Sequence, residues 1–185
     1  MATKRSNVQG RLNVGIRRDH VAIMKKSWGL TTKIADGTKT IETRWYKTRA
    51  NPWDNIYPDD MVYFKDSGDP VTVRAKVSQV EQYEDLTPKR VIELLSIFAK
   101  KDGLGIDSGS IKKFHYLFQD KRYCIVIFLA QATRVEPFDI DKSGFGLQTA
   151  WLTVSDIDQI RTDSSISAKA NLDFIATVRQ DRNRP

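Results

Sequence analysis

Apolar and polar residues alternate in several short stretches of the chain, and this alternation predicts strands. The clearest case is 71–80, where Val71, Val73, Ala75 and Val77 are separated by polar residues and would share one buried face. Further strands are predicted at 20–24, 39–45, 61–65, 123–135 and 150–154. The pattern is typical of a sheet built mostly from short strands joined by turns.

Apolar residues at helical spacing predict two or three helices between these strands. The first would run from Ser27, a favourable N-cap, to about Asp36, with Gly37 as its left-handed stop. The second lies within 87–103, opens with Thr-Pro and repeats apolar residues three and four positions apart. Residues 111–119 are expected to form a third helix. Segments without either pattern are expected to be irregular, namely 51–59, 103–109 and 137–146.

The length and the order of these elements indicate a single domain. A chain of 185 residues can bury a core of its own. Short strands with inserted helices favour an α+β fold, with a small mixed sheet or barrel and two to three flanking helices. We expect a basic, flexible N-terminal arm at 1–18, the domain itself at 19–160 and a C-terminal extension at 161–185.

The positive charge of the chain lies at its two ends. The net charge of +7 points to nucleic acid as a partner. However, the first 18 residues hold five basic residues and no acidic one, whereas 19–160 hold equal numbers of both. A basic arm can attract phosphates in any sequence, and it can equally be a solubilising tail. The chemistry of the middle must therefore come from its local sites.

Composition argues against several classes of protein. Cys124 is the only cysteine, so no intrachain disulfide can form, and its apolar neighbours predict an inert buried thiol. One cysteine with His20 and His115 cannot make an ordinary structural zinc site, and no metal or cofactor is expected. Neither histidine lies in a catalytic motif, so both are interpreted as structural. Without an apolar run of about 20 residues or a signal peptide, a cytoplasmic location without membrane contact is the expectation.

The densest group of chemically active residues lies in the strand predicted at 39–45. Thr40, Glu42 and Arg44 would share one face of this strand, and Lys39 projects from the preceding turn. An ammonium, a carboxylate and a guanidinium around one point suit a polar ligand with an anionic part. A surface salt bridge at the start of a strand is the alternative interpretation.

This region resembles the ASCH domain, a member of the PUA-like superfamily. The string Gly-x-Lys-Thr-x-Glu-x-Arg follows a predicted helix and precedes a polar loop and a strand that opens with Asp. The resemblance covers about 20–155, and its matching pieces are 34–45, 56–65, 71–80 and 138–151. The family usually has Gly-Asp before the second strand, where this chain has Asp59-Asp60 and so lacks the turn glycine.

The resemblance implies a small PUA-like β-barrel with a cleft that binds RNA or a nucleoside. Aromatic side chains can stack on bases, basic ones can contact phosphate, and Glu42 can accept a hydrogen bond from a base edge. Trp53, in a polar loop, is expected to be the least buried tryptophan. The predicted ligand-binding residues are Trp28, Lys39, Thr40, Glu42, Arg44, Trp45, Tyr46, Trp53 and Lys65. A nucleic-acid-binding module is therefore the first hypothesis.

Two other functions stay open. Some small ASCH proteins are amidohydrolases that remove the acetyl group of N4-acetylcytidine, and similarity to them would make Lys39 catalytic. If the chain is an enzyme, Glu42 would also be catalytic, because a Lys39–Glu42 pair could hold a water for hydrolysis. In those enzymes a threonine follows the lysine by three residues, where this chain has Glu42 instead. A lysine base must lose its proton near neutral pH, and an adjacent carboxylate opposes that loss. The remaining alternative is a protein-interaction domain with a vestigial cleft.

Overall fold

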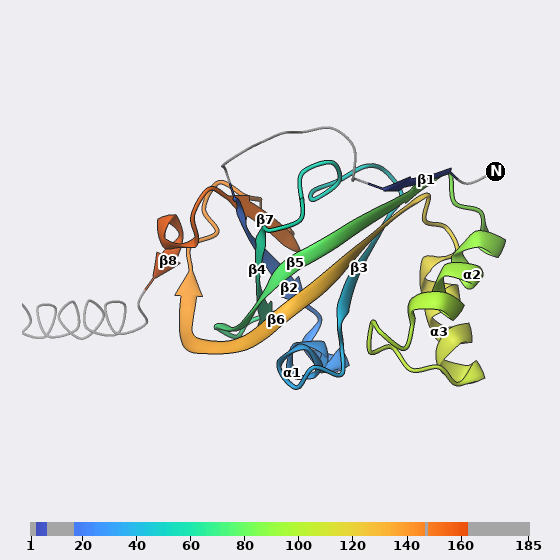
Figure 1. Cartoon of the computed structure of the whole chain (residues 1–185), viewed down its shortest axis with the longest axis horizontal. Helices are drawn as coiled ribbons and strands as arrows, with labels where there is room; N and C mark the ends of the chain where they lie inside the picture. The colour runs from blue at the N-terminus through green and yellow to red at the C-terminus, as the bar shows by residue number, and fades with distance from the viewer. Residues whose placement is uncertain (1–2, 7–16, 147, 163–185) are drawn as a thin grey trace, which may run out of the picture.

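The chain forms one mixed sheet with helices packed around it (Figure 1). The computed structural model describes residues 3–6, 17–146 and 148–162. The strands are β1 (Thr3–Ser6), β2 (Asp19–Met24), β3 (Ile41–Tyr46), β4 (Met61–Asp66), β5 (Val71–Glu84), β6 (Tyr123–Ile140), β7 (Trp151–Val154) and β8 (Arg161–Thr162). The helices are α1 (Leu30–Ala35), α2 (Pro88–Phe98) and α3 (Ser108–Phe118), with short 3₁₀ helices η1 (Lys26–Trp28) and η2 (Ile157–Gln159).

The sheet has the order β3-β6-β5-β4-β2-β7, with β1 beside β5 and β8 beside β6. Strands β2 and β4 pair in parallel, and every other described pair is antiparallel. A mixed sheet with segregated helices is the α+β class that the sequence predicted. In this order β3 is an edge strand, and it carries Glu42 and Arg44, while Lys39 and Thr40 come directly before it.

Strands β5 and β6 curl the sheet into a half-barrel. They are 14 and 18 residues long, and their pairing register shifts at three places. Such bulges bend a strand and increase its twist, so two long strands can wrap around a core instead of lying flat. The alternation predicted for 71–80 is confirmed, because Val71, Val73, Ala75 and Val77 are all buried.

Helices α2 and α3 interrupt the β5–β6 pair and lie together at one end of the sheet (Figure 1). The base of this excursion stays closed, since Tyr83 still pairs with Cys124 and the Leu86 N–H donates to the Arg122 carbonyl at 3.0 Å. Thr87 caps α2 as predicted, its hydroxyl accepting from the Arg90 N–H at 3.2 Å. Among the described residues, no helix is long and apolar enough to cross a membrane.

The hydrophobic core lies inside the curl of the sheet and continues beneath α2. Cys124 is fully buried there, so its predicted burial is confirmed, and burial raises the pKa of its thiol well above the ordinary value. A smaller apolar cluster around Phe138 and Leu152 fills the other end of the half-barrel. His20 is fully buried between the two, in agreement with a structural role.

Several predicted element boundaries were wrong: β3 begins at Ile41 and not at 39, β5 continues to Glu84, and α3 begins at Ser108, inside the stretch expected to be irregular. Ser27 does not cap a helix, because Gly29 adopts a left-handed conformation with φ of 59° and divides η1 from α1. Residues 137–140 are not irregular but extend β6, since Phe138 is buried opposite Val71 and the next two residues pair with β8. Within the predicted N-terminal arm, Thr3–Ser6 form β1 on β5. The rest of that arm, except 17 and 18, and nearly all of the C-terminal extension lie outside the described residues.

Candidate functional site

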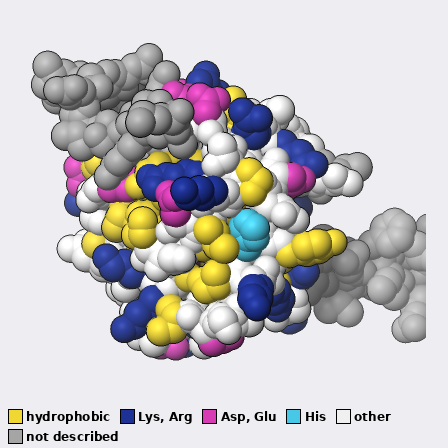
Figure 2. All heavy atoms as spheres, turned by 90° about the vertical axis from the view of Figure 1, so that its right-hand side faces the viewer, with side chains coloured by type: hydrophobic (Ala, Val, Ile, Leu, Met, Phe, Trp, Pro, Cys, Tyr) yellow, Lys and Arg dark blue, Asp and Glu magenta, His cyan; other side chains and the backbone are white. Residues whose placement is uncertain are grey.

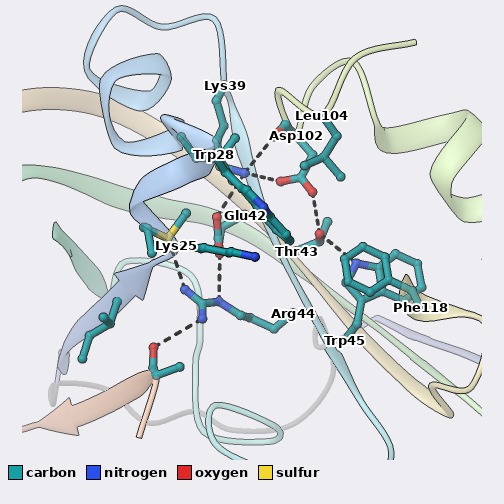
Figure 3. A pocket seen from close by; sticks show the side chains of 14 residues that line it. Lys25, Trp28, Lys39, Glu42, Thr43, Arg44, Trp45, Asp102, Leu104 and Phe118 are labelled. Carbon is teal, nitrogen blue, oxygen red and sulfur yellow. Dashed lines mark hydrogen bonds and ion pairs between the residues drawn. The ribbon is translucent and has the colours of Figure 1, made fainter. Parts of the chain in front are cut away.

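A pocket of about 270 Å³ lies between the edge strand β3, the η1–α1 segment and the loop that joins α2 to α3 (Figure 3). Charged groups form its floor and aromatic rings form one wall. Its lining consists of Ile23, Met24, Lys25, Trp28, Leu30, Lys39, Glu42, Thr43, Arg44, Trp45, Asp102, Leu104, Phe118 and Ala150. Lys39, Glu42 and Arg44 of the Lys-Thr-x-Glu-x-Arg string therefore line a cavity.

Lys39 is at the centre of the floor and is only 1% exposed. Its ammonium contacts the Asp102 carboxylate, donates to the Asp102 carbonyl at 3.0 Å and lies 3.0 Å from Glu42 Oε2. Burial opposes the charge of Lys39, but the two carboxylates outweigh burial and raise its pKa above the ordinary value. Lys39 is therefore a permanent cation at neutral pH.

Backbone contacts bring Lys39 and Asp102 together across 63 residues of sequence. The Thr40 N–H donates to the Lys101 carbonyl at 2.8 Å, which joins the start of β3 to the end of the α2 segment. Gly103 follows with φ of 70°, and a Cβ there would stand 3.1 Å from Lys33 Cδ. The positive φ favours glycine at this turn, and a side chain there would also require Lys33 on α1 to shift slightly.

Asp102 also joins the floor of the pocket to its aromatic wall. Its Oδ2 accepts from the Thr43 hydroxyl at 2.5 Å, and the Trp45 indole N–H donates to that hydroxyl at 3.0 Å. Burial raises the pKa of Asp102 against the attraction of Lys39. The Asp102 carboxylate is consequently a stronger base than an exposed aspartate.

Arg44 extends the charged floor toward β7. Its Nε lies 2.8 Å from Glu42 Oε1, and its two terminal nitrogens approach the Ala150 carbonyl and Met24 Sδ at 3.3 Å each. The guanidinium also lies over the Trp151 ring at 5.0 Å. These contacts hold a planar donor group in one orientation at the pocket surface.

A buried hydrogen-bond chain supports this orientation from behind. The Trp151 indole N–H donates to His20 Nδ1 at 3.1 Å, so Nδ1 is the acceptor of that ring. Nε2 then carries the proton and donates to Asp60 Oδ2 at 3.1 Å. The Asp at the start of β4, part of the family-like pattern, thus fixes the tautomer of His20 and through it the Trp151 ring beneath Arg44.

The aromatic wall is a contiguous series of rings. Trp45 stacks on Phe118 with centroids 5.1 Å apart and planes 6° from parallel. Phe118 contacts Phe114 at 6.0 Å, and Phe114 meets Trp28 edge to face at 5.4 Å. The Lys25 ammonium lies over Trp28 at 5.5 Å. Polar and aromatic surfaces therefore face each other across the pocket.

The pocket brings together five of the nine predicted ligand-binding residues: Trp28, Lys39, Glu42, Arg44 and Trp45. Thr40 is exposed outside the lining, and Lys65 lies on β4. Tyr46 points away and donates to the Asn51 carbonyl at 2.7 Å. Trp53 was expected to be the least buried tryptophan, but it is 8% exposed because it packs against Tyr123.

Sequence reasoning missed Asp102, Leu104 and Phe118, which all come from the α2–α3 segment. Nothing in the local pattern marks them, because Asp102 reads as part of a charged helix end and Phe118 as a core residue. Within the described part of the chain, no three His, Cys, Asp or Glu side chains are grouped so that they could hold a metal ion.

Comparison with known proteins identifies the fold. No protein-family model and no curated protein sequence matches the chain. Among solved structures, the chain is similar to ASCH from Zymomonas mobilis, with a TM-score of 0.54, 14% identity and coverage of 78% of this chain and 96% of that one. Two single-substitution variants of the same protein give TM-scores of 0.53 and 0.54 at 13% and 14% identity, covering 75% and 76% of this chain and 91% of each variant. The resemblance inferred from the sequence is confirmed at the level of the fold.

Proposed function

We propose, on the premise that the chain has the ASCH fold, that it binds nucleic acid, and RNA in particular, by taking one unstacked base or nucleoside into the pocket. The observation that carries this proposal is the pairing of a fixed Glu42–Arg44 edge with a stacked Trp45–Phe118 wall. A nucleobase offers the matching surfaces, since it has a hydrogen-bonding edge and an aromatic face.

The size and charge of the pocket support a base instead of a phosphate. A volume of about 270 Å³ lies just below the usual range for drug-sized ligands, which suits one base or nucleoside. Lys39 is compensated by Asp102 and Glu42, and Arg44 is compensated by Glu42. The two buried carboxylates, Glu42 and Asp102, would repel a phosphate placed among these groups, whereas they would not repel a neutral ring.

The test is a titration of the intrinsic tryptophan fluorescence, because Trp28 and Trp45 line the pocket. The ligands are cytidine, uridine and an eight-nucleotide single-stranded RNA. Arg44→Gln should lower affinity by about 10–100-fold, since a charge-assisted hydrogen bond contributes about 1.5–3 kcal/mol. Arg49→Gln is the matched control, because Arg49 also lies over a tryptophan ring, at 5.7 Å from that of Trp53, but outside the pocket. Equal affinities for the two variants, or no binding by the unmodified chain, would overturn the proposal and favour a protein-interaction domain.

An amidohydrolase acting on an acylated nucleoside is the second candidate, favoured by the 2.5 Å contact of Thr43 with Asp102. Asp102 would take the hydroxyl proton while Thr43 Oγ1 attacks the acyl carbon. The C–N bond then breaks, the same proton passes to the leaving nitrogen, and water hydrolyses the acyl-threonine ester. Lys39, whose pKa is raised, would act as a cation here and not as a base.

Chromatography of N4-acetylcytidine incubated with the protein tests this second candidate. Release of cytidine that stops in Thr43→Val and continues in Thr40→Val would establish it, since Thr40 lies outside the pocket. Absence of cytidine, with RNA binding intact, would leave the binding function alone.

A further inference from the structure

We propose that a single strand of RNA leaves the pocket over its aromatic rim and continues along the exposed side of α3, so that the ligand is an RNA segment and not a free nucleoside. The inference rests on the proposed function of the pocket. It assigns the contact at the pocket mouth to Lys25, which is part of the lining, and the contacts outside the pocket to Lys112, Lys113, Tyr116 and Leu117.

Two cations lie over adjacent aromatic rings, and the first of these pairs, Lys25 over Trp28, lines the pocket. Lys25 lies 5.5 Å from the centre of the Trp28 ring, and Lys113 lies 5.6 Å from the centre of the Phe114 ring. These rings touch each other at 5.4 Å, and Trp28 lines the pocket. A phosphate at the pocket mouth would therefore meet the Lys25 ammonium, and Lys113 lies over the next ring, outside the lining of the pocket.

The outer side of α3 continues this surface away from the pocket. Lys113 and Leu117 are four residues apart, as are Lys112 and Tyr116, so the four side chains form two neighbouring rows on the helix. Tyr116 is 76% exposed and Leu117 is 42% exposed. A flat aromatic ring between lysines is the combination that contacts the bases and backbone of a single strand.

The charge of this face complements a phosphate backbone. Residues 87–122 contain eight basic and four acidic residues, and one of the acidic residues is the buried Asp102. The equal numbers of basic and acidic residues in 19–160 therefore conceal a basic region on the two helices. Figure 2 shows this face, on which Lys and Arg side chains surround hydrophobic ones. The basic residues concerned are Lys89, Arg90, Lys100, Lys101, Lys112, Lys113, Lys121 and Arg122.

The three lysines of this surface, Lys25, Lys112 and Lys113, favour RNA over a protein as the ligand. Within the part of the chain that the structure describes, Lys25, Lys112 and Lys113 have no carboxylate within ion-pair distance. Exposed cations without an acidic neighbour are available to phosphate groups. Of the five large hydrophobic residues that are exposed in the described chain, Tyr116 and Leu117 lie on α3, four residues after Lys112 and Lys113.

The experiment compares cytidine with an eight-nucleotide single-stranded RNA at several salt concentrations. The key variant is Lys112→Gln/Lys113→Gln, in which both substitutions are exposed and should leave the fold unchanged by circular dichroism. Arg134→Gln/Lys142→Gln is the matched control, because these exposed residues lie on the distal half of β6 and in the loop beyond it. The slope of log affinity against log salt counts phosphate contacts, at about 0.7 per contact for single strands.

We expect the α3 variant to weaken RNA binding about tenfold or more and to reduce the salt slope by about 1.4, with cytidine binding unchanged. An RNA affinity and slope equal to those of the control variant would overturn the inference, while binding that depends on Arg44 would still support the pocket. The opposite result, in which the α3 variant loses RNA binding and Arg44→Gln does not, would retain the α3 surface and reject the pocket.

Discussion

Removal of the Lys39 ammonium is the most direct test of how the floor of the site is held. Lys39→Met keeps the apolar stem but leaves Asp102 and Glu42, each 3% exposed, without their shared cation. Arg44 still lies beside Glu42, so the uncompensated charge is that of Asp102. Breaking a buried ion pair from one side costs about 3–5 kcal/mol, and we expect a loss of that size in the free energy of unfolding at pH 7.

The loss should depend on pH in a defined direction. Without Lys39, Asp102 should have a pKa above that of the unfolded chain, because burial already raises it with the lysine present. Protonation then relieves the uncompensated charge, so the cost of Lys39→Met should shrink as the pH falls from 7 to 5. In the unmodified protein the pKa of Lys39 is raised above 10.5, so its contribution is complete below that pH and is lost as the pH rises further.

Urea unfolding at pH 5 and pH 7 measures the loss of stability in Lys39→Met and its decrease at the lower pH. Lys101→Met is the control, because Lys101 is exposed next to Asp102 and should change stability little. Lys39→Met/Asp102→Leu should recover most of the stability, since an apolar pair can replace a buried ion pair. A loss below about 1 kcal/mol at pH 7, or equal losses at both pH values, would refute the account of the site as a buried charge network.

Three further predictions concern other buried groups. Cys124 should not react with a thiol reagent until the protein unfolds, and labelling of the folded protein at the rate of a free thiol would contradict its burial. Burial raises the pKa of Tyr46 to about 12, so its contribution to stability is present below pH 10 and is lost as the pH rises toward 12. The absorbance difference between the protein and Tyr46→Phe checks this, and a midpoint near pH 10 would be incompatible with it. Asp60→Leu leaves the His20 Nε2–H and the backbone N–H groups of Arg18 and Tyr57 without their acceptor and should cost at least about 1–3 kcal/mol in urea unfolding, whereas an unchanged midpoint would argue against the buried hydrogen-bond chain.

Much of the fold could be predicted from the sequence because its signals are local. Residues 71–80 alternate, and Thr87 caps the helix that begins one residue later, so each pattern refers to neighbours along the chain. The errors arose where a contact distant in sequence decided the outcome. Residues 137–140 continue β6 because Phe138 is buried opposite Val71, which no pattern around Pro137 reveals.

The candidate site was predictable only in the half that one strand supplies. Lys39, Glu42 and Arg44 lie within six residues of each other, and a strand brings them together without further information. Asp102 completes the same cluster from 63 residues away, through a backbone contact at Lys101 that the sequence does not show. Trp53 was wrongly predicted to be the least buried tryptophan because the loop around it is polar. It is in fact buried under Arg49 and against Tyr123.

The excursion between β5 and β6 divides the pocket between two parts of the molecule with different constraints. Its base is closed at Leu86 and Arg122, so the strands on either side are already joined before the helices begin. One wall, with Asp102, Leu104 and Phe118, belongs to the excursion, and the floor belongs to the half-barrel. A different helical pair of similar apolar face could therefore be grafted between the same two points, provided that it supplies a carboxylate in the place of Asp102 for the buried Lys39. Ligand preference could then diverge by exchange of one module, while the barrel that carries Lys39, Glu42 and Arg44 is inherited unchanged.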